Sequence, residues 1–284
     1  MSVSADEVMG SATQVASLFA ANGVQSLYGP FAAKLYHMLT KHDTVAVDEL
    51  KAAVAGRPGP ALELGCGTGR LTFPLLEWGY ATTALDLSPD MLKILQDRLA
   101  EPSAAELASR AETVVGDMTS FSLDRKFGIV VIGGSAIWSL DEEQRASAFA
   151  RIKEHLTPDG RLYITVVNFP QSTEGEPFEN IFVFTTEDDT SPLLCTVFNY
   201  VDPVESIRSV NILCQRVTNG IVTDTVFGSQ LTHPVAPAVL EKEIERAGLT
   251  VVGRHTIDAE VSLPNAEASP LRAQLRPTLL EASL

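Results

Sequence analysis

The stretch "ALELGCGTGRLTFPLLEWGYATTALDLSPDML", residues 61–92, decides the fold. Its first four residues suit a short buried strand, and glycines follow at three alternate positions, Gly65, Gly67 and Gly69. Glycines spaced in this way let the backbone turn tightly and let a ligand approach bare main chain. The stretch therefore predicts a strand, a ligand-binding turn and a helix in succession.

The spacing of these glycines argues against two common nucleotide sites. A phosphate-binding loop needs a Gly-Lys-Ser/Thr ending, and no such lysine is present. A dinucleotide fingerprint needs a glycine at position 70, where Arg70 would crowd the start of the helix. A ligand without phosphates suits the loop better.

Two acidic residues follow the next two predicted strands. Asp86 ends "TTALD", where a carboxylate can accept hydrogen bonds from both hydroxyls of a ribose. Asp117 and Met118 follow "VVG", where they could contact the amino group and the face of an adenine. The alternatives are a strand-end cap for Asp86 and a turn residue for Asp117.

Strands and helices alternate along the middle of the chain, which predicts a Rossmann-like, doubly wound α/β fold with a seven-stranded, mostly parallel sheet. The strands are expected at 61–64, 81–87, 112–115, 128–132, 161–167 and 250–255 and in the tail "RPTLLEAS", with helices at 89–99, 142–155 and 238–247. Apolar periodicity predicts helices at 4–22 and from residue 30 onward. Short strands at 181–185, 193–200, 210–217 and 223–231 predict an antiparallel insert.

These patterns divide the chain into three regions. We expect an N-terminal helical cap over residues 1–58 and a ligand-binding core over 59–168 and 236–284, with residues 169–235 as an inserted substrate-binding β subdomain. The 284 residues carry a formal charge of −15, which disfavours a nucleic-acid partner. Apolar runs are too short for a membrane span, and three scattered cysteines favour neither a disulfide framework nor a metal site. The expected compartment is the cytoplasm.

Four segments resemble the successive motifs of class I S-adenosylmethionine-dependent methyltransferases: "LELGCGTG", "LDLSPDML", "VVGDM" and "LTPDGRLYI". A weaker likeness to natural-product methyltransferases, including aminosugar N,N-dimethyltransferases, extends over the whole chain through "SLYGP", "NFP", "YVDP", "IR" and "LEKEIERAGL". One departure concerns a His-Arg pair of the aminosugar enzymes, where this chain has Ser229 and Gln230.

The resemblance implies S-adenosylmethionine as the cofactor. It places eleven residues at the cofactor: Tyr28, Glu63, Gly65, Gly67, Gly69, Asp86, Leu87, Met91, Asp117, Met118 and Gly133. Asp86 would hold the ribose, Asp117 and Met118 would frame the adenine, and Tyr28 would close over the methionine portion.

Methyl transfer from a sulfonium needs alignment above all, and a base only when the nucleophile arrives protonated. We therefore assign no catalytic base and no metal. Four residues are candidates for binding the acceptor, each with a structural alternative: Tyr36, Ser135, Trp138 and Asn168. For His37 and His233 the structural interpretation is favoured, and His155, at a helix C-terminus, is excluded.

The favoured function is methylation of a small-molecule or peptide acceptor, of the daptide type for example, in natural-product biosynthesis, most readily at an amine. Three alternatives remain: O-methylation of a hydroxylated metabolite, a non-catalytic S-adenosylmethionine-binding module, and a nicotinamide oxidoreductase, which Arg70 opposes. Neither a nucleic acid nor a membrane is an expected partner, and a homodimer is left open.

Overall fold

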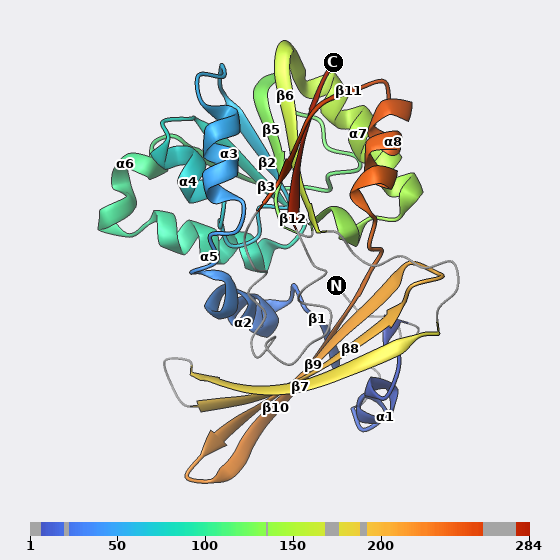
Figure 1. Ribbon diagram of the computed structural model, residues 1–284. Helices are drawn as coiled ribbons and strands as arrows, with labels where there is room; N and C mark the ends of the chain where they lie inside the picture. The colour runs from blue at the N-terminus through green and yellow to red at the C-terminus, as the bar shows by residue number, and fades with distance from the viewer. Residues whose placement is uncertain (1–6, 20–22, 135, 168–175, 188–191, 258–276) are drawn as a thin grey trace.

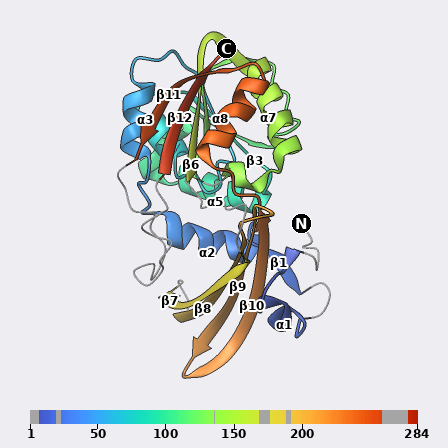
Figure 2. The same ribbon diagram turned by 45° about the vertical axis from the view of Figure 1, so that its right-hand side comes forward.

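The computed structural model describes residues 7–19, 23–134, 136–167, 176–187, 192–257 and 277–284. Two sheets dominate it, one of seven strands and one of five (Figure 1). Figure 2 shows the five-stranded sheet as a separate layer below the larger one.

The larger sheet confirms the predicted Rossmann-like α/β core. Five neighbouring strands run parallel, and β12 is antiparallel to its neighbours β6 and β11. The order is β11 (Thr250–Thr256), β12 (Pro277–Ser283), β6 (Leu156–Val167), β5 (Phe127–Ile132), β2 (Ala61–Leu64), β3 (Thr82–Asp86) and β4 (Ala111–Val115). The carboxyl ends of the parallel strands point toward the second sheet (Figure 1).

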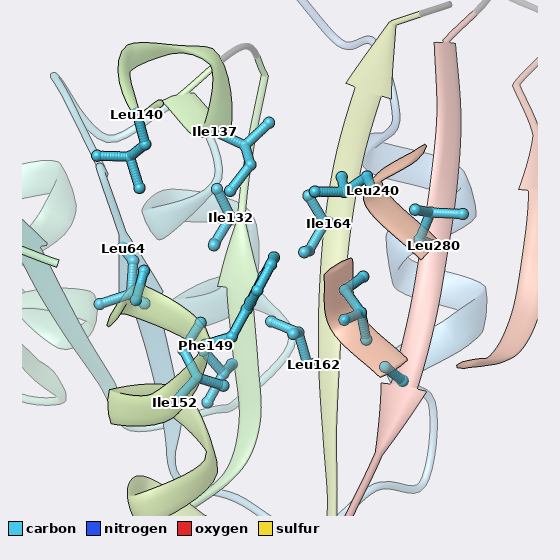
Figure 3. Packing of buried hydrophobic residues seen from close by; sticks show 14 of the residues in the cluster. Leu64, Ile132, Ile137, Leu140, Phe149, Ile152, Leu162, Ile164, Leu240 and Leu280 are labelled. Carbon is cyan, nitrogen blue, oxygen red and sulfur yellow. The ribbon is translucent and has the colours of Figure 1, made fainter. Parts of the chain in front are cut away.

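Helices cover both faces of this sheet. On one face, α7 (Glu142–His155) and α8 (Pro237–Arg246) enclose the largest apolar cluster, in which Phe149 packs near Leu64, Ile132 and Leu162 (Figure 3). On the other face lie α3 (Val47–Val54), α4 (Thr72–Glu77) and α5 (Pro89–Leu99). Short helical turns complete the connections at Pro102–Ala104, Ala105–Ala108 and Ala136–Ser139. Helix α3 was not among the expected elements.

Local signals explain where two of these helices begin. The side chain of Ser88 accepts a hydrogen bond from the Met91 N–H and caps α5, whose first residue is a proline. Asp141 and Gln144 form a reciprocal capping box at the start of α7. Both helices therefore start where their sequences favour it.

The second sheet contains the four predicted strands of the insert, each slightly longer than expected. They are β7 (Phe178–Glu187), β8 (Pro192–Asp202), β9 (Ile207–Thr218) and β10 (Ile221–Thr232), and each pairs antiparallel with the next. An unexpected fifth strand, β1 (Val24–Ser26), pairs parallel with β10. The N-terminal region therefore contributes a strand to this sheet.

Two N-terminal helices pack on opposite faces of the second sheet. Helix α2 (Pro30–Thr40) packs through Leu35 on the face that turns toward the core. Helix α1 (Ala12–Ala16) packs on the other face near Phe198. The expectation of one helix over 4–22 was wrong within the described residues, because Gly10 takes a left-handed φ of 69° that ends any helix before it.

Candidate functional site

The glycine-rich turn follows β2 at the carboxyl end of the parallel strands. Gly67 has a φ of 55°, and its N–H donates a 2.7 Å hydrogen bond to Oδ2 of Asp86. A Cβ added at Gly67 would have one neighbour within 4 Å, Cε1 of Tyr36 at 3.7 Å. The turn therefore exposes bare backbone to a space bordered by Tyr36.

Asp86 closes this turn from the end of β3. Its Oδ1 accepts a 2.8 Å hydrogen bond from the N–H of Ser88, while Oδ2 accepts the one from Gly67. Burial raises the pKa of Asp86, and these backbone N–H groups oppose that rise. Each oxygen has a further lone pair, so the carboxylate could also accept the hydroxyl groups of a ligand.

Three more predicted residues lie around the turn. Cε of Met118 would lie 3.2 Å from a Cβ added at Gly65, so the thioether borders the first glycine. Asp117 accepts hydrogen bonds from the N–H and the hydroxyl of Thr119, which is the turn role weighed as its alternative. A Cβ added at Gly133 would lie 2.4 Å from Cδ1 of Leu71, so a ligand could approach this backbone only from the side opposite Leu71.

Gly69 has a packing role. A Cβ added there would lie 2.5 Å from Cδ1 of Leu95, on α5, so the glycine lets the turn pack against that helix. Substitution at Gly69 should therefore disturb packing before it disturbs a ligand.

The remaining predicted cofactor residues differ in accessibility. Leu87, directly after Asp86, is 49% exposed, whereas Met91 is 1% exposed on α5. Glu63 is 2% exposed and accepts a 2.5 Å hydrogen bond from the hydroxyl of Thr72, and burial raises its pKa to about 7. Leu87 is therefore the one of the three that a ligand could reach without rearrangement.

Tyr28 connects the second sheet to this turn. Its hydroxyl accepts a hydrogen bond from the amide of Gln230 on β10, and its carbonyl oxygen accepts one of 2.7 Å from Oγ of Ser88. Burial raises the pKa of the Tyr28 hydroxyl, and the neighbouring Tyr36 and Asp86 raise it further. The structure thus places Tyr28 near Ser88 and Asp86, after the end of β3, and its role over a cofactor stays a prediction.

The four residues predicted to bind the acceptor differ in where the structure places them. Tyr36 borders Gly67 and is 40% exposed, whereas Trp138 is 3% exposed within the apolar core, which favours its structural alternative. Ser135 and Asn168 lie outside the described residues.

The histidines weighed above have polar contacts in the structure. Nδ1 of His37 lies 3.1 Å from Oγ1 of Thr68, between Gly67 and Gly69 in the glycine turn, and the backbone N–H of His233 donates to the carbonyl of Trp138. His155 lies at the end of α7, and its Nε2 accepts a hydrogen bond from the N–H of Leu123.

Sequence reasoning missed a polar group on the inner face of the second sheet. Asn199, Arg208 and Gln230 share the face on which α2 packs, because their strands are paired Asn199↔Val210↔Gln230 and Val201↔Arg208. Strand alternation could have predicted this face once the pairing was known. Ser229, which together with Gln230 stands where the aminosugar enzymes have a His-Arg pair, lies on the opposite face of the sheet.

Residues 61–160 match the family model described as "Methyltransferase domain". The chain carries a methyltransferase domain. The match begins with β2 and includes the glycine turn, Asp86 and the Asp117–Met118 turn, so the family-defining segment coincides with the candidate site.

Relatives of the methyltransferase domain include enzymes named for N-methylation. The chain is 31% identical over 104 residues to cypemycin N-terminal methyltransferase of a Streptomyces species, covering 36% of this chain and 40% of the relative. It is 30% identical over 160 residues to dTDP-3-amino-3,6-dideoxy-α-D-glucopyranose N,N-dimethyltransferase of Streptomyces fradiae, covering 53% and 58%. The matched part thus spans roughly half the length of these curated relatives.

A solved structure extends the likeness beyond the methyltransferase domain. The glycopeptide N-methyltransferase MtfA, crystallised with S-adenosyl-L-methionine, is 28% identical, with a TM-score of 0.57 over 85% of this chain and 93% of that one. The chain therefore has the fold of S-adenosylmethionine-dependent methyltransferases. None of the described helices is long and apolar enough to cross a membrane.

Proposed function

We propose that this protein is an S-adenosylmethionine-dependent methyltransferase that N-methylates a small-molecule or peptide acceptor in natural-product biosynthesis. The observation that carries the proposal is the Gly67–Asp86 unit. Bare backbone faces open space under Tyr36, and a carboxylate beside it has lone pairs for a ribose. This arrangement lies within the segment that matches the methyltransferase domain.

The residues present fit this cofactor. Gly65 and Gly67 would lie against its methionine and ribose, Asp86 would accept from the ribose hydroxyls, and Met118 would lie against the adenine. When bound, S-adenosylmethionine supplies an activated methyl group on a positively charged sulfur. Tyr28 and Tyr36 lie on the outer side of the turn, where they would limit access of water and restrict the approach of the acceptor.

An amine acceptor is supported in two ways. The relatives of the chain are named for N-methylation of a peptide terminus, an aminosugar and a glycopeptide. An amine that arrives unprotonated needs no base, and His37, whose ring contacts Thr68 in the turn, is engaged in that hydrogen bond. The protein would then act chiefly by aligning the nucleophile with the methyl group.

Calorimetric titration tests the cofactor assignment. We expect S-adenosylhomocysteine to bind and NAD to produce no heat. Tight binding of NAD without a response to S-adenosylhomocysteine would instead support an oxidoreductase. Incubation of candidate extracts with methyl-labelled S-adenosylmethionine, followed by mass spectrometry, then identifies the acceptor and distinguishes a methylated nitrogen from a methylated oxygen.

A further inference from the structure

The inner face of the second sheet carries a cation, Arg208, at the end of the sheet nearer the core, so this face is more than an apolar cover. On β9 this face alternates Arg208, Val210 and Ile212, and the two apolar residues pack near α2. Arg208 lies opposite Val201 of β8 and Thr232 of β10, at the end of the strands nearer the core, where Val201 joins the core cluster. Its guanidinium is therefore at the junction of the two sheets.

Arg208 has an incomplete set of partners. Its Nε donates a 2.7 Å hydrogen bond to Oδ1 of Asn199, a neutral acceptor. Over the described ranges, no carboxylate oxygen lies within ion-pair distance of it. Burial lowers the pKa of Arg208 to about 10, and the neighbouring Tyr28 opposes this fall. By contrast, the buried Arg145 is paired with both oxygens of Glu243.

Tyr28 links this cation to the proposed cofactor turn. The Tyr28 hydroxyl lies close enough to both Asp86 and Arg208 for their charges to act on it, with opposite effects on its pKa. The same hydroxyl accepts a hydrogen bond from Gln230, which lies diagonally across from Arg208 on the inner face. Tyr28 is thus within reach of both Arg208 and Asp86, the carboxylate proposed to bind the ribose, so a group bound at Arg208 would lie near the proposed cofactor turn.

We propose that Arg208, oriented by Asn199, binds an oxyanion of the methyl acceptor, a carboxylate or a phosphate, and so positions the acceptor's nucleophile for transfer. The planar guanidinium has two terminal N–H edges left for such a group, which it can bind in a bidentate manner. A chain with a net charge of −15 repels anions in general, so this half-buried cation would provide a local site that attracts them. The inference rests on the proposed function and narrows its substrate class to anionic acceptors.

Inorganic phosphate and acetate are the probes for this site. Each is titrated into the S-adenosylhomocysteine complex, with chloride at equal ionic strength as the reference, while the thermal midpoint and the binding heat are followed. We expect saturable binding of at least one probe to the wild-type protein. Phosphate alone would indicate a phosphorylated acceptor, and acetate alone a carboxylated one.

Three variants localise the response. Arg208→Gln should weaken probe binding by about 10- to 100-fold, the range for losing a charged hydrogen-bond donor pair. Arg208→Lys should restore part of it, because the charge remains while the planar geometry is lost. The control Arg216→Gln removes a cation from the far end of the same strand and should change nothing. All three should bind S-adenosylhomocysteine as the wild type does.

The outcomes separate the two proposals. If S-adenosylhomocysteine binds but neither anion does, or if Arg208→Gln and Arg216→Gln affect the probes equally, the anion subsite is refuted and the methyltransferase proposal stands. If S-adenosylhomocysteine fails to bind the wild type, the proposed function itself fails. Once an acceptor is known, Arg208→Gln should raise its KM and leave the KM of a neutral amide analogue unchanged.

Discussion

The N–H of Gly67 and the carboxylate of Asp86 are joined by a hydrogen bond of 2.7 Å, so the glycine turn and the end of β3 form one unit. The acid holds the turn in shape through Gly67 and Ser88. In the proposed function its remaining lone pairs would also accept the hydroxyls of a ribose, so substitution of Asp86 tests both roles.

Asp86→Ala should remove both roles. Asp86→Asn keeps one acceptor oxygen but places its NH2 against one of the two backbone N–H groups of Gly67 and Ser88, so it should weaken both roles in part. We expect S-adenosylhomocysteine binding to weaken by about 1.5–3 kcal/mol for each charged hydrogen bond lost, with the alanine variant weaker than the asparagine variant. Calorimetry gives the dissociation constants, and circular dichroism shows whether the variants remain folded. An unchanged dissociation constant in a folded alanine variant would contradict the assignment.

Gly67→Ala should abolish cofactor binding, and Gly56→Ala should not. Both glycines have positive φ, 55° and 74°, so both substitutions incur the left-handed penalty of roughly 1–2 kcal/mol in stability. A Cβ at Gly56 would have no neighbour within 4 Å, whereas one at Gly67 would enter the space that borders Tyr36. Urea unfolding should show similar losses for the pair. Equal cofactor affinities would mean that the turn does not touch the ligand.

Glu63→Gln should gain stability relative to the wild type as the pH rises. Burial raises the pKa of Glu63 to about 7, so the folded protein holds this proton more tightly than the unfolded chain does. Its stabilising contribution is present below the unfolded pKa of about 4.3 and is lost as the pH rises toward 7. The glutamine side chain does not titrate, so its contribution to stability does not change with pH.

We therefore expect the difference in unfolding free energy between Glu63→Gln and the wild type to grow by about 1–3 kcal/mol from pH 4.5 to pH 8. Urea titrations at the two pH values measure it. Glu143→Gln, an exposed position on α7, corrects for the loss of one carboxylate. A constant difference across this range would show that Glu63 is ionised in the folded protein at low pH.

Helices α7 and α8 are joined by two ion pairs that should differ in their contribution to the free energy of unfolding. Arg145 and Glu243 are buried, with side chains 7% and 6% exposed, whereas Arg246 and Glu142 are 66% and 68% exposed. Glu243→Ala should cost about 3–5 kcal/mol, because it leaves a buried cation unpaired. Glu142→Ala should cost less than about 1 kcal/mol.

The double variant Arg145→Met/Glu243→Ala tests the reason for the difference. Removing both charges should recover part of the stability that Glu243→Ala loses, as measured by urea unfolding. If the double variant is less stable than Glu243→Ala by the full cost of losing Arg145, then packing of the arginine side chain, rather than its charge, holds the helices together.

Substitution on the inner face of the second sheet should change acceptor use while cofactor binding is preserved. Val210→Ala removes two methyl groups from the face that turns toward the core, and Ile181→Ala changes an exposed position on β7. We expect Val210→Ala to alter the acceptor's KM, and both variants to bind S-adenosylhomocysteine normally. Loss of cofactor affinity in Val210→Ala with unchanged acceptor preference would argue for an interface role of the sheet.

The core could be predicted from the sequence because its signals are local. Glycine spacing, strand-end acids and the caps of α5 and α7 each depend on a few neighbouring residues, and the structure confirms the elements that they predict. Strand β1 could not be predicted in this way. Its three residues carry little periodicity, and a partner far along the chain determines their conformation.

In the candidate site, too, the residues set by local sequence could be predicted and those that depend on distant pairing could not. Gly67 and Asp86 could be predicted because the single β2–turn–α4–β3 unit contains both. Arg208 and Gln230 could not, because their meeting with Tyr28 depends on the register between β9 and β10 and on the docking of a whole sheet. For Trp138, whose position near the strand ends suggested a pocket, the structure favours the structural alternative, because the core encloses its side chain.

The pairing of β1 with β10 also has a consequence for the order in which the molecule assembles. Val24 meets a partner, Phe227, that the ribosome adds about two hundred residues later. Tyr28 lies just beyond β1, so it reaches its place only after β10 exists, even though its own segment is synthesised early. A nascent or truncated chain could fold the methyltransferase core yet lack this tyrosine's contacts. Folding would thus delay completion of the site until the distant part of the chain has emerged, and a refolding assay should show cofactor affinity recovering more slowly than core helicity.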